Sequence, residues 1–497
     1  MEFMDIVLGI FTYQNLGFLI AGVFCGIIGG ALPGISPSMT IALLLPVSLY
    51  LPSSYAVMLL IGAYQGAMYG GSISAVLINT PGTASAAATA FDGYQMAVNG
   101  QAGKAIGMSL TASCVGGLIS ALVLIFLAKW LTIVSLKFGP AEYFGVMLLA
   151  LTLIAGVCGE NMIKGVIAAA LGLLVASVGQ DPVVGSERLT FDIFNLFDGF
   201  AMLSVFIGVF AMSELMMQLR QNPAKLNSSP ELMDYRKDRL SFAEFWSQRW
   251  NMIISGLIGT FVGILPGVGG STASFLAYAE AKRRSKHPEK FGTGYIEGLA
   301  AAEAANNGVC GGALIPMLAL GIPGDVVTAI MVGAFVVHGI KPGPLLFTQH
   351  INDVYTIYVS LLLSTIFLLI IGLIFLPMIV RIVRVRKSIL FPCVFILCIV
   401  GTYSARSNLF DCMMMLGFGL FGYFMRCNKF QLAPFIIAFV LGPEAELNFR
   451  LALRISNNNY MTFLEKPISA ALLILTVVSA TFFIRRSMKQ KDVETTI

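Results

Sequence analysis

The stretch Gly26-Ile27-Ile28-Gly29-Gly30-Ala31-Leu32-Pro33-Gly34 decides the fold, because the chain repeats its pattern as Gly259-Thr260-Phe261-Val262-Gly263-Ile264-Leu265-Pro266-Gly267. The two stretches share Gly, Gly, Leu, Pro and Gly at the same positions. Further along, Gly70-Gly71 matches Gly311-Gly312, and Pro81-Gly82 matches Pro323-Gly324. Similar motifs in the same order and at similar spacing indicate an internal duplication.

Composition places the duplicated units in a membrane. The 497 residues are 57% hydrophobic and only 11% charged, whereas soluble domains carry about 25% charged residues. This balance excludes a disordered chain, a nucleic-acid binder and a disulfide scaffold. We therefore expect an all-α polytopic membrane protein with about 12 transmembrane passes.

Several apolar segments are too short to cross a bilayer alone, and they occur in pairs around Gly/Pro breaks. Segments 17–32 and 38–50 flank the first break, and 251–266 and 271–281 flank the second. Each pair is either a helical hairpin that enters the bilayer and returns or one broken helix. Charge favours the hairpin, because the basic loops on both sides of the second pair, 219–250 and 280–291, should both be cytoplasmic.

The same charge rule predicts the topology of the whole chain. The first basic residue is Lys104, so the N-terminus should face outward and the C-terminus should face the cytoplasm. The first hairpin then opens from outside and the second from inside, which makes the repeats inverted. We divide the chain into a first half (1–218), a cytoplasmic linker (219–250) and a second half (251–497). In this topology 443–466 is an external amphipathic surface segment.

Inverted repeats with broken helices near the membrane midplane are typical of secondary transporters. A broken helix leaves free N–H groups that attract anions and free C=O groups that can coordinate Na⁺. We therefore expect a carboxylate-binding cleft at the breaks. Its candidate residues are Gly34, Ser36, Asn79, Thr80, Pro81, Gly82, Thr83, Gly267, Gly269, Gly270, Gly321, Pro323, Gly324 and Asp325.

Polar side chains at membrane depth are further functional candidates. Asn306 and Asn307, with Thr80 and Asp325, are the predicted Na⁺ ligands, since Na⁺ prefers oxygen. Glu303 shares a helix face with Asn307, but it could instead lie at the water boundary. Asp92 is expected to cap or turn a segment. The breaks and the Gly-x-x-x-Gly pairs have a simpler alternative meaning, which is a kink or a close-packed helix seam.

These motifs resemble the large membrane subunit of tripartite tricarboxylate transporters, the TctA family. The resemblance rests on Gly30–Pro37, on Asn79–Thr83 with Asp92-Gly93-Tyr94, on Asn306–Gly324 and on His338–Pro344, and it extends over nearly the whole chain. Ser74, Ala84 and Gln95 stand where the family pattern has Pro, which could mark a different substrate. The resemblance implies a non-enzymatic, cation-driven importer of carboxylates in the bacterial inner membrane. It also implies two partners, a small four-helix membrane subunit and a periplasmic solute-binding protein. A homodimer is compatible with the sequence.

Other classes of function fit less well. The sequence has no HExxH motif or P-loop for an intramembrane enzyme or an ATP-driven pump, and no cofactor is expected beyond Na⁺ or H⁺ as the coupling ion. A channel would need a charged or carbonyl-lined pore. A stand-alone cation-coupled symporter that needs no binding protein remains the closest alternative.

Overall fold

A computed structural model describes residues 9–157, 162–181, 183–220, 234–236, 238–383, 385 and 387–494. Residues 1–8, 158–161, 182, 221–233 and 237 of the predicted linker, 384, 386 and 495–497 lie outside this description. The first half contains α2 (Tyr13–Ala31), α3 (Pro37–Ser48), α4 (Ser53–Ile78), α5 (Ala87–Val98), α6 (Ala102–Ser135), α7 (Pro140–Val157), α8 (Met162–Ala176), β1 (Gly179–Gln180), β2 (Glu187–Arg188), η1 (Phe194–Leu196), α9 (Met202–Phe206), η2 (Ile207–Met212) and α10 (Ser213–Leu219).

The remaining elements follow the linker. They are α12 (Phe242–Ser247), α13 (Arg249–Ile264), α14 (Gly269–Arg284), η3 (Pro288–Lys290), α15 (Ile296–Leu320), α16 (Val326–Val337), α17 (Leu346–Gln349), α18 (Ile351–Ile374), α19 (Leu376–Val383), α20 (Lys387–Arg406), α21 (Leu409–Cys427), α22 (Leu432–Ile455), α23 (Thr462–Glu465) and α24 (Pro467–Glu494). The expected helical architecture is present, with one antiparallel pair of two-residue strands as an addition.

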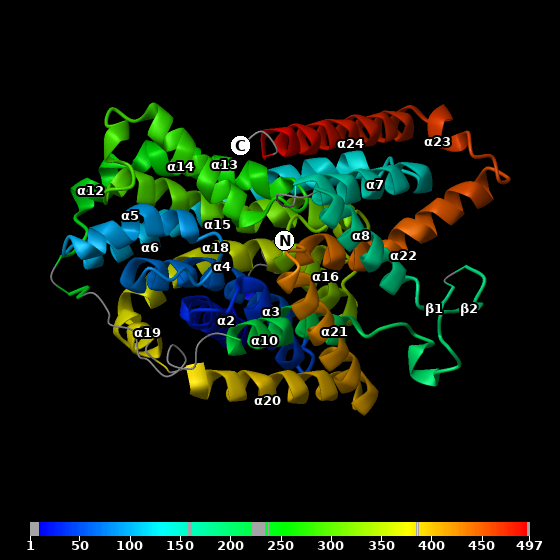
Figure 1. Ribbon diagram of the computed structural model, residues 1–497, viewed down its shortest axis with the longest axis horizontal. Coiled ribbons are helices and arrows are strands. Elements are labelled where there is room, and N and C mark those ends of the chain that lie inside the picture. The colour runs from blue at the N-terminus through cyan, green and yellow to red at the C-terminus, as the bar shows by residue number, and fades with distance from the viewer. Residues whose placement is uncertain are drawn as a thin grey trace.

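The protein is a polytopic membrane protein. Within the described residues, eight helices are long and apolar enough to cross a bilayer, and four shorter apolar helices accompany them. In Figure 1, α24 and α20 lie at opposite edges of the bundle, α4, α15 and α18 lie between them, and the β1–β2 hairpin projects from one end.

Two central helices, α4 and α15, are long enough to span but are not among those eight. Nearly every side chain of α4 from Ala56 to Leu77, and of α15 from Gly298 to Ala319, is buried. A helix that is surrounded by protein does not need the uniformly apolar surface that lipid requires. The interior of the bundle is therefore where polar side chains concentrate.

Glycines form the seams that hold each hairpin against its central helix. A β-carbon added at Gly26 or Gly30 of α2 would collide with the backbone of Ala63 or Ala67 in α4. At the aligned positions of the second half, a β-carbon added at Gly259 would collide with the backbone of Ala305. One added at Gly263 would lie 2.8 Å from the Val309 carbonyl oxygen. Backbones can approach this closely only where the side chain is absent. The Gly-x-x-x-Gly pairs are therefore close-packed helix seams, which is the simpler of the two meanings that the sequence allowed.

Each predicted hairpin consists of two helices separated by a turn, but α2 is long and apolar enough to cross a bilayer by itself, which the expectation for 17–32 did not allow. The chain leaves α2 at Leu32 and begins α3 at Pro37, and it leaves α13 at Leu265 and begins α14 at Gly269. One boundary differs from the prediction, because α22 continues through Pro443 to Ile455 rather than ending before the expected surface segment 443–466. Its charges there are compensated by ion pairs, with Arg450 contacting Asp181 at 2.6 Å and Glu446 at 2.7 Å.

Candidate functional site

The two central helices run antiparallel and exchange hydrogen bonds between buried side chains. The Asn307 amide nitrogen donates to the Gln65 side-chain oxygen at 2.8 Å, and the Asn306 amide nitrogen donates to the Met68 carbonyl at 3.0 Å. Closer to the N-terminus of α15, the Glu303 carboxyl accepts a hydrogen bond from the Ser72 hydroxyl of α4. Partner numbers on α4 thus rise as those on α15 fall. The centre of the protein is a polar interface between the two halves.

Asn306 and Asn307 keep an acceptor free in this interface. Both residues are 0% exposed, and neither Oδ1 atom has a hydrogen-bond partner in the part of the chain that the structure describes. A buried carbonyl-type oxygen without a partner costs free energy unless a ligand, water or ion satisfies it. These two oxygens are therefore available to a cation or to a donor on a substrate.

The first Pro-Gly break follows α4. Asn79 ends the helix in the left-handed region at a φ of 50°, and the Thr80 hydroxyl donates to the Ile78 carbonyl. Asn79 and Thr80 are exposed, and Pro81 is partly buried. The buried Gly82 and Thr83 turn inward, and the Thr83 hydroxyl lies 3.0 Å from that of Ser85. A β-carbon at Gly82 would collide with the Gly30 carbonyl oxygen.

The second break follows α15 and has the same seam. Gly321 ends the helix at a φ of 75°, and a β-carbon at Gly324, next to Pro323, would collide with the Gly263 carbonyl. The Gly324 carbonyl accepts from the Gly267 N–H at 2.8 Å, which ties this break to the tip of the second hairpin. This break is more enclosed than the first, because the residues from Ile322 to Asp325 are buried.

Asp325 is held by both halves. Its Oδ1 accepts from the Thr328 N–H at 2.8 Å, so it caps α16, and its Oδ2 accepts from the Tyr64 hydroxyl of α4 at 2.6 Å. The carboxylate thus occupies the positive end of α16. In this arrangement Asp325 already has its partners, and a substrate anion at that helix end would meet a like charge.

The N-terminus of α14, in contrast, has no side-chain cap. A β-carbon at Gly270 would lie 3.2 Å from Asn306 Oδ1 and 3.2 Å from Ser85 Cβ. The start of α14, Asn306 and the inner part of the first break therefore meet, and this group combines residues from both halves. In the other hairpin, Ser36 caps α3, and the Gly34 carbonyl accepts from Gln218.

The structure brings together only part of the predicted site. Gly270 lies beside Asn306 and Ser85, and the Thr83 hydroxyl lies 3.0 Å from that of Ser85. The Gly267 N–H donates to the Gly324 carbonyl. The predicted Na⁺ ligands do not form one hydrogen-bonded group among the described residues. The Thr80 hydroxyl donates to the Ile78 carbonyl, and Asp325 bonds Tyr64 and Thr328. Sequence reasoning missed Tyr64, Gln65 and Ser85. A Gln and a Tyr inside the apolar run 56–78 were the available signal for the first two.

Asp92 has a structural role, but it lies inside α5 rather than at the cap or turn that the sequence predicted. Its Oδ1 accepts from the N–H groups of Gly292, Gly294 and Tyr295, and its Oδ2 accepts from the Tyr278 hydroxyl. These contacts hold the loop that leads into α15. Asp92 therefore fixes the start of a central helix and is fully engaged in doing so.

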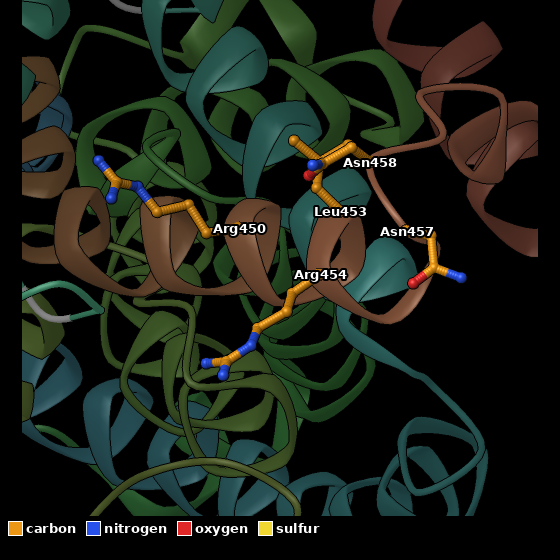
Figure 2. A pocket seen from close by; sticks show the side chains of 5 residues that line it. All are labelled: Arg450, Leu453, Arg454, Asn457 and Asn458. Atoms are coloured by element: carbon orange, nitrogen blue, oxygen red, sulfur yellow. The ribbon is translucent and has the colours of Figure 1, made fainter.

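A separate cavity of about 370 Å³ lies at the end of α22, lined by Arg450, Leu453, Arg454, Asn457 and Asn458. Figure 2 shows the two arginine side chains pointing to different sides of the helix. Arg450 is ion-paired to Asp181 and Glu446, whereas Arg454 is exposed. The lining residues do not converge on one point, so this depression is not the candidate site.

Known proteins place the chain in a family. Residues 16–437 match the sequence profile described as "Tripartite tricarboxylate transporter TctA family". A protein of Agrobacterium vitis, described as an uncharacterized 52.8 kDa protein in the TAR-I ttuC' 3' region, is 36% identical over 480 residues, covering 97% of this chain and 95% of the relative. A second protein from the same organism, in the TAR-II ttuC' 3' region, is 36% identical over 233 residues, covering 47% of this chain and 96% of the relative.

No solved structure matches the chain. The match to the profile includes both central helices and both Pro-Gly breaks, which are the elements that build the candidate site. With its polytopic helical fold, the chain belongs to the TctA family and is a non-enzymatic membrane permease component of tripartite tricarboxylate transport.

Proposed function

We propose that the chain is the large permease subunit of an importer that moves dicarboxylates or tricarboxylates across the bacterial inner membrane by alternating access. Transport is coupled to the entry of Na⁺ or H⁺. The observation that carries this proposal is the polar interface between α4 and α15. It is buried, it joins the two halves, and each of its helices ends at a Pro-Gly break.

The packing supports an inverted repeat of 1–218 and 251–497 joined by 219–250. When Pro81-Gly82 is aligned with Pro323-Gly324, Gln65 aligns with Asn307, and these two side chains bond each other. A rotation that exchanges the two antiparallel helices has its axis perpendicular to them. If both helices cross the bilayer, this axis lies in the membrane plane, which is the arrangement of inverted repeats.

We place the substrate carboxylate at the uncapped N-terminus of α14. Free N–H groups there favour an anion, and Asn306 and Ser85 lie beside Gly270. The remaining break residues, from Asn79 to Thr83 and from Gly321 to Asp325, form the walls that open and close. Gly34, Ser36, Gly267 and Gly269 shape the hairpin tips. The exposed first break and the buried second break fit a cleft that opens on one side at a time.

Na⁺ is the preferred coupling ion in this proposal, because the interface offers neutral oxygens from Asn306 and Asn307. Thr80 and Asp325 would join them only after a rearrangement of the breaks. Uptake into vesicles that contain the complete tripartite system should follow a Na⁺ gradient at constant pH. Uptake that ignores Na⁺ and follows only the pH gradient would identify H⁺ as the ion.

The partners follow from the family. A small four-helix membrane subunit and a periplasmic solute-binding protein should both be required for uptake, with the N-terminus periplasmic and the C-terminus cytoplasmic. Omitting the binding protein tests this directly, because full uptake without it would favour the stand-alone symporter. Asn307→Ala and Thr80→Ala should each abolish uptake while leaving membrane insertion intact. Normal uptake in both variants would mean that the cleft lies elsewhere.

A further inference from the structure

Glu303 lies at the centre of a group of hydroxyls that the substrate cleft does not use. Ser72 of α4 donates to its Oε1 at 2.5 Å, Thr89 of α5 donates to the same oxygen, and Ser113 of α6 donates to Oε2 at 2.9 Å. All four side chains are 0% exposed. Three helices of the first half thus converge on one carboxyl of the second half.

A fifth side chain completes this group. The Ser109 hydroxyl, one turn before Ser113 on α6, lies beside the Glu303 carboxyl. It is 1% exposed, and the Glu303 carboxyl is the polar group that it faces. We call Glu303, Ser72, Thr89, Ser109 and Ser113 the Glu303 cage.

The charge of the cage is not balanced within the described part of the chain. No lysine, arginine or histidine pairs with Glu303 there, and it lies within α15 rather than at a helix N-terminus. Asp325, the other buried carboxylate of α15 and α16, has the N-terminus of α16 to stabilise it. An ionised carboxylate removed from water costs several kcal/mol when nothing balances its charge. The Glu303 carboxyl must therefore be neutralised, either by a proton or by a bound cation.

We infer that the Glu303 cage is a binding site for one Na⁺ ion. Carboxylate and hydroxyl oxygens are the donors that a hard cation prefers, and a monovalent ion neutralises a single carboxylate. Because hydroxyls are both donors and acceptors, Ser72, Thr89 and Ser113 can turn their lone pairs toward the ion. Ser109 supplies a further hydroxyl oxygen beside the carboxyl.

Within the described residues, the first half has no matching cage at the aligned position. In the alignment that matches Pro81-Gly82 with Pro323-Gly324, the position equivalent to Glu303 is the buried Ile61. A cation in the cage would connect α4, α5 and α6 to α15, so its binding would favour the arrangement of the two halves in which these helices meet. This inference rests on the proposed cation coupling and adds a second Na⁺ position to the one proposed at Asn306 and Asn307.

Equilibrium binding of ²²Na⁺ to the purified full chain tests the inference without any transport step. Glu303→Gln should lose one bound Na⁺ per chain. Ser109→Ala and Ser113→Ala should each weaken Na⁺ binding about tenfold or more, as is typical when the support of a metal ligand is removed. The matched control is Ser364→Ala, because Ser364 is buried and its hydroxyl bonds only the Leu361 carbonyl of its own helix.

Unchanged Na⁺ binding in Glu303→Gln would overturn the site, and so would K⁺ binding in preference to Na⁺. If Glu303→Gln does not fold, wild-type affinity in both serine variants overturns it equally. The binding measurement is independent of the proposed function. A Na⁺ site that depends on Glu303 in a protein whose uptake ignores Na⁺ would refute the coupling while leaving the site intact.

Discussion

The bond between Tyr64 and Asp325 is the most direct test of how the two halves are held together. Tyr64→Phe removes one hydroxyl and leaves the Asp325 Oδ2 atom without its 2.6 Å donor. A hydrogen bond to a charged group contributes about 1.5–3 kcal/mol. Because both residues are buried, water does not readily replace the lost donor. We expect the free energy of unfolding to fall by about that amount.

The chain supplies a matched control five residues further along the same helix. Tyr69 is also 0% exposed, but its hydroxyl has no hydrogen-bond partner among the described residues. Tyr69→Phe removes the same atom without breaking a bond, so it should leave stability unchanged or raise it slightly. Unfolding of both purified variants in mixed micelles measures the difference. Equal stability of Tyr64→Phe and Tyr69→Phe would refute the assignment of this bond as a connection between the halves.

Three other predictions concern the second break, an ion pair and the topology. Gly324→Val should reduce uptake at least tenfold, because a β-carbon there would lie 2.6 Å from Ala313 Cα. The control Gly417→Val, at an open position on α21, should transport normally. Equal uptake by the two variants would contradict the close packing at Gly324. The Lys104 ammonium, 2.8 Å from Glu244, lowers the pKa of Glu244 to about 2. The pair therefore stabilises the protein above the ordinary pKa of 4.5 and loses its effect as the pH falls toward 2. The pair is partly exposed, so Lys104→Met should cost about 1 kcal/mol or less at pH 7 and less still at pH 3; an equal cost at both pH values would contradict this. A cysteine introduced at Val184, which is 72% exposed, should react with an impermeant reagent added to intact cells. A cysteine introduced at Ser229, outside the described residues, should not react. Labelling at Ser229 would mean that the predicted topology is reversed.

Local patterns were enough to predict the two turns that separate α2 from α3 and α13 from α14. Pro33-Gly34 and Pro266-Gly267 interrupt apolar runs, and a proline cannot continue a helix without losing a hydrogen bond. The glycine seams were equally visible, because Gly26, Gly30, Gly259 and Gly263 recur at helical spacing. The continuation of α22 through Pro443 was not predicted. There the loss of one backbone bond is tolerated, and Arg450 beyond it is paired with Asp181, which lies far away in the sequence.

The sequence by itself determined the membrane class, the turns at Pro33-Gly34 and Pro266-Gly267, the duplicated motifs and the family, because each depends on composition or on residues close together in the chain. Only the tertiary structure decided which polar residues meet. Asn306 and Glu303 lie on one helix, yet the first neighbours the start of α14 and the second is enclosed by α4, α5 and α6. The local sequence around Ser72, Thr89 and Ser113 gives no sign of the Glu303 carboxyl, which lies 190 or more residues further along the chain. Their convergence follows from the crossing of helices, and a side chain's neighbours across a helix interface are set by that packing rather than by its position in the sequence.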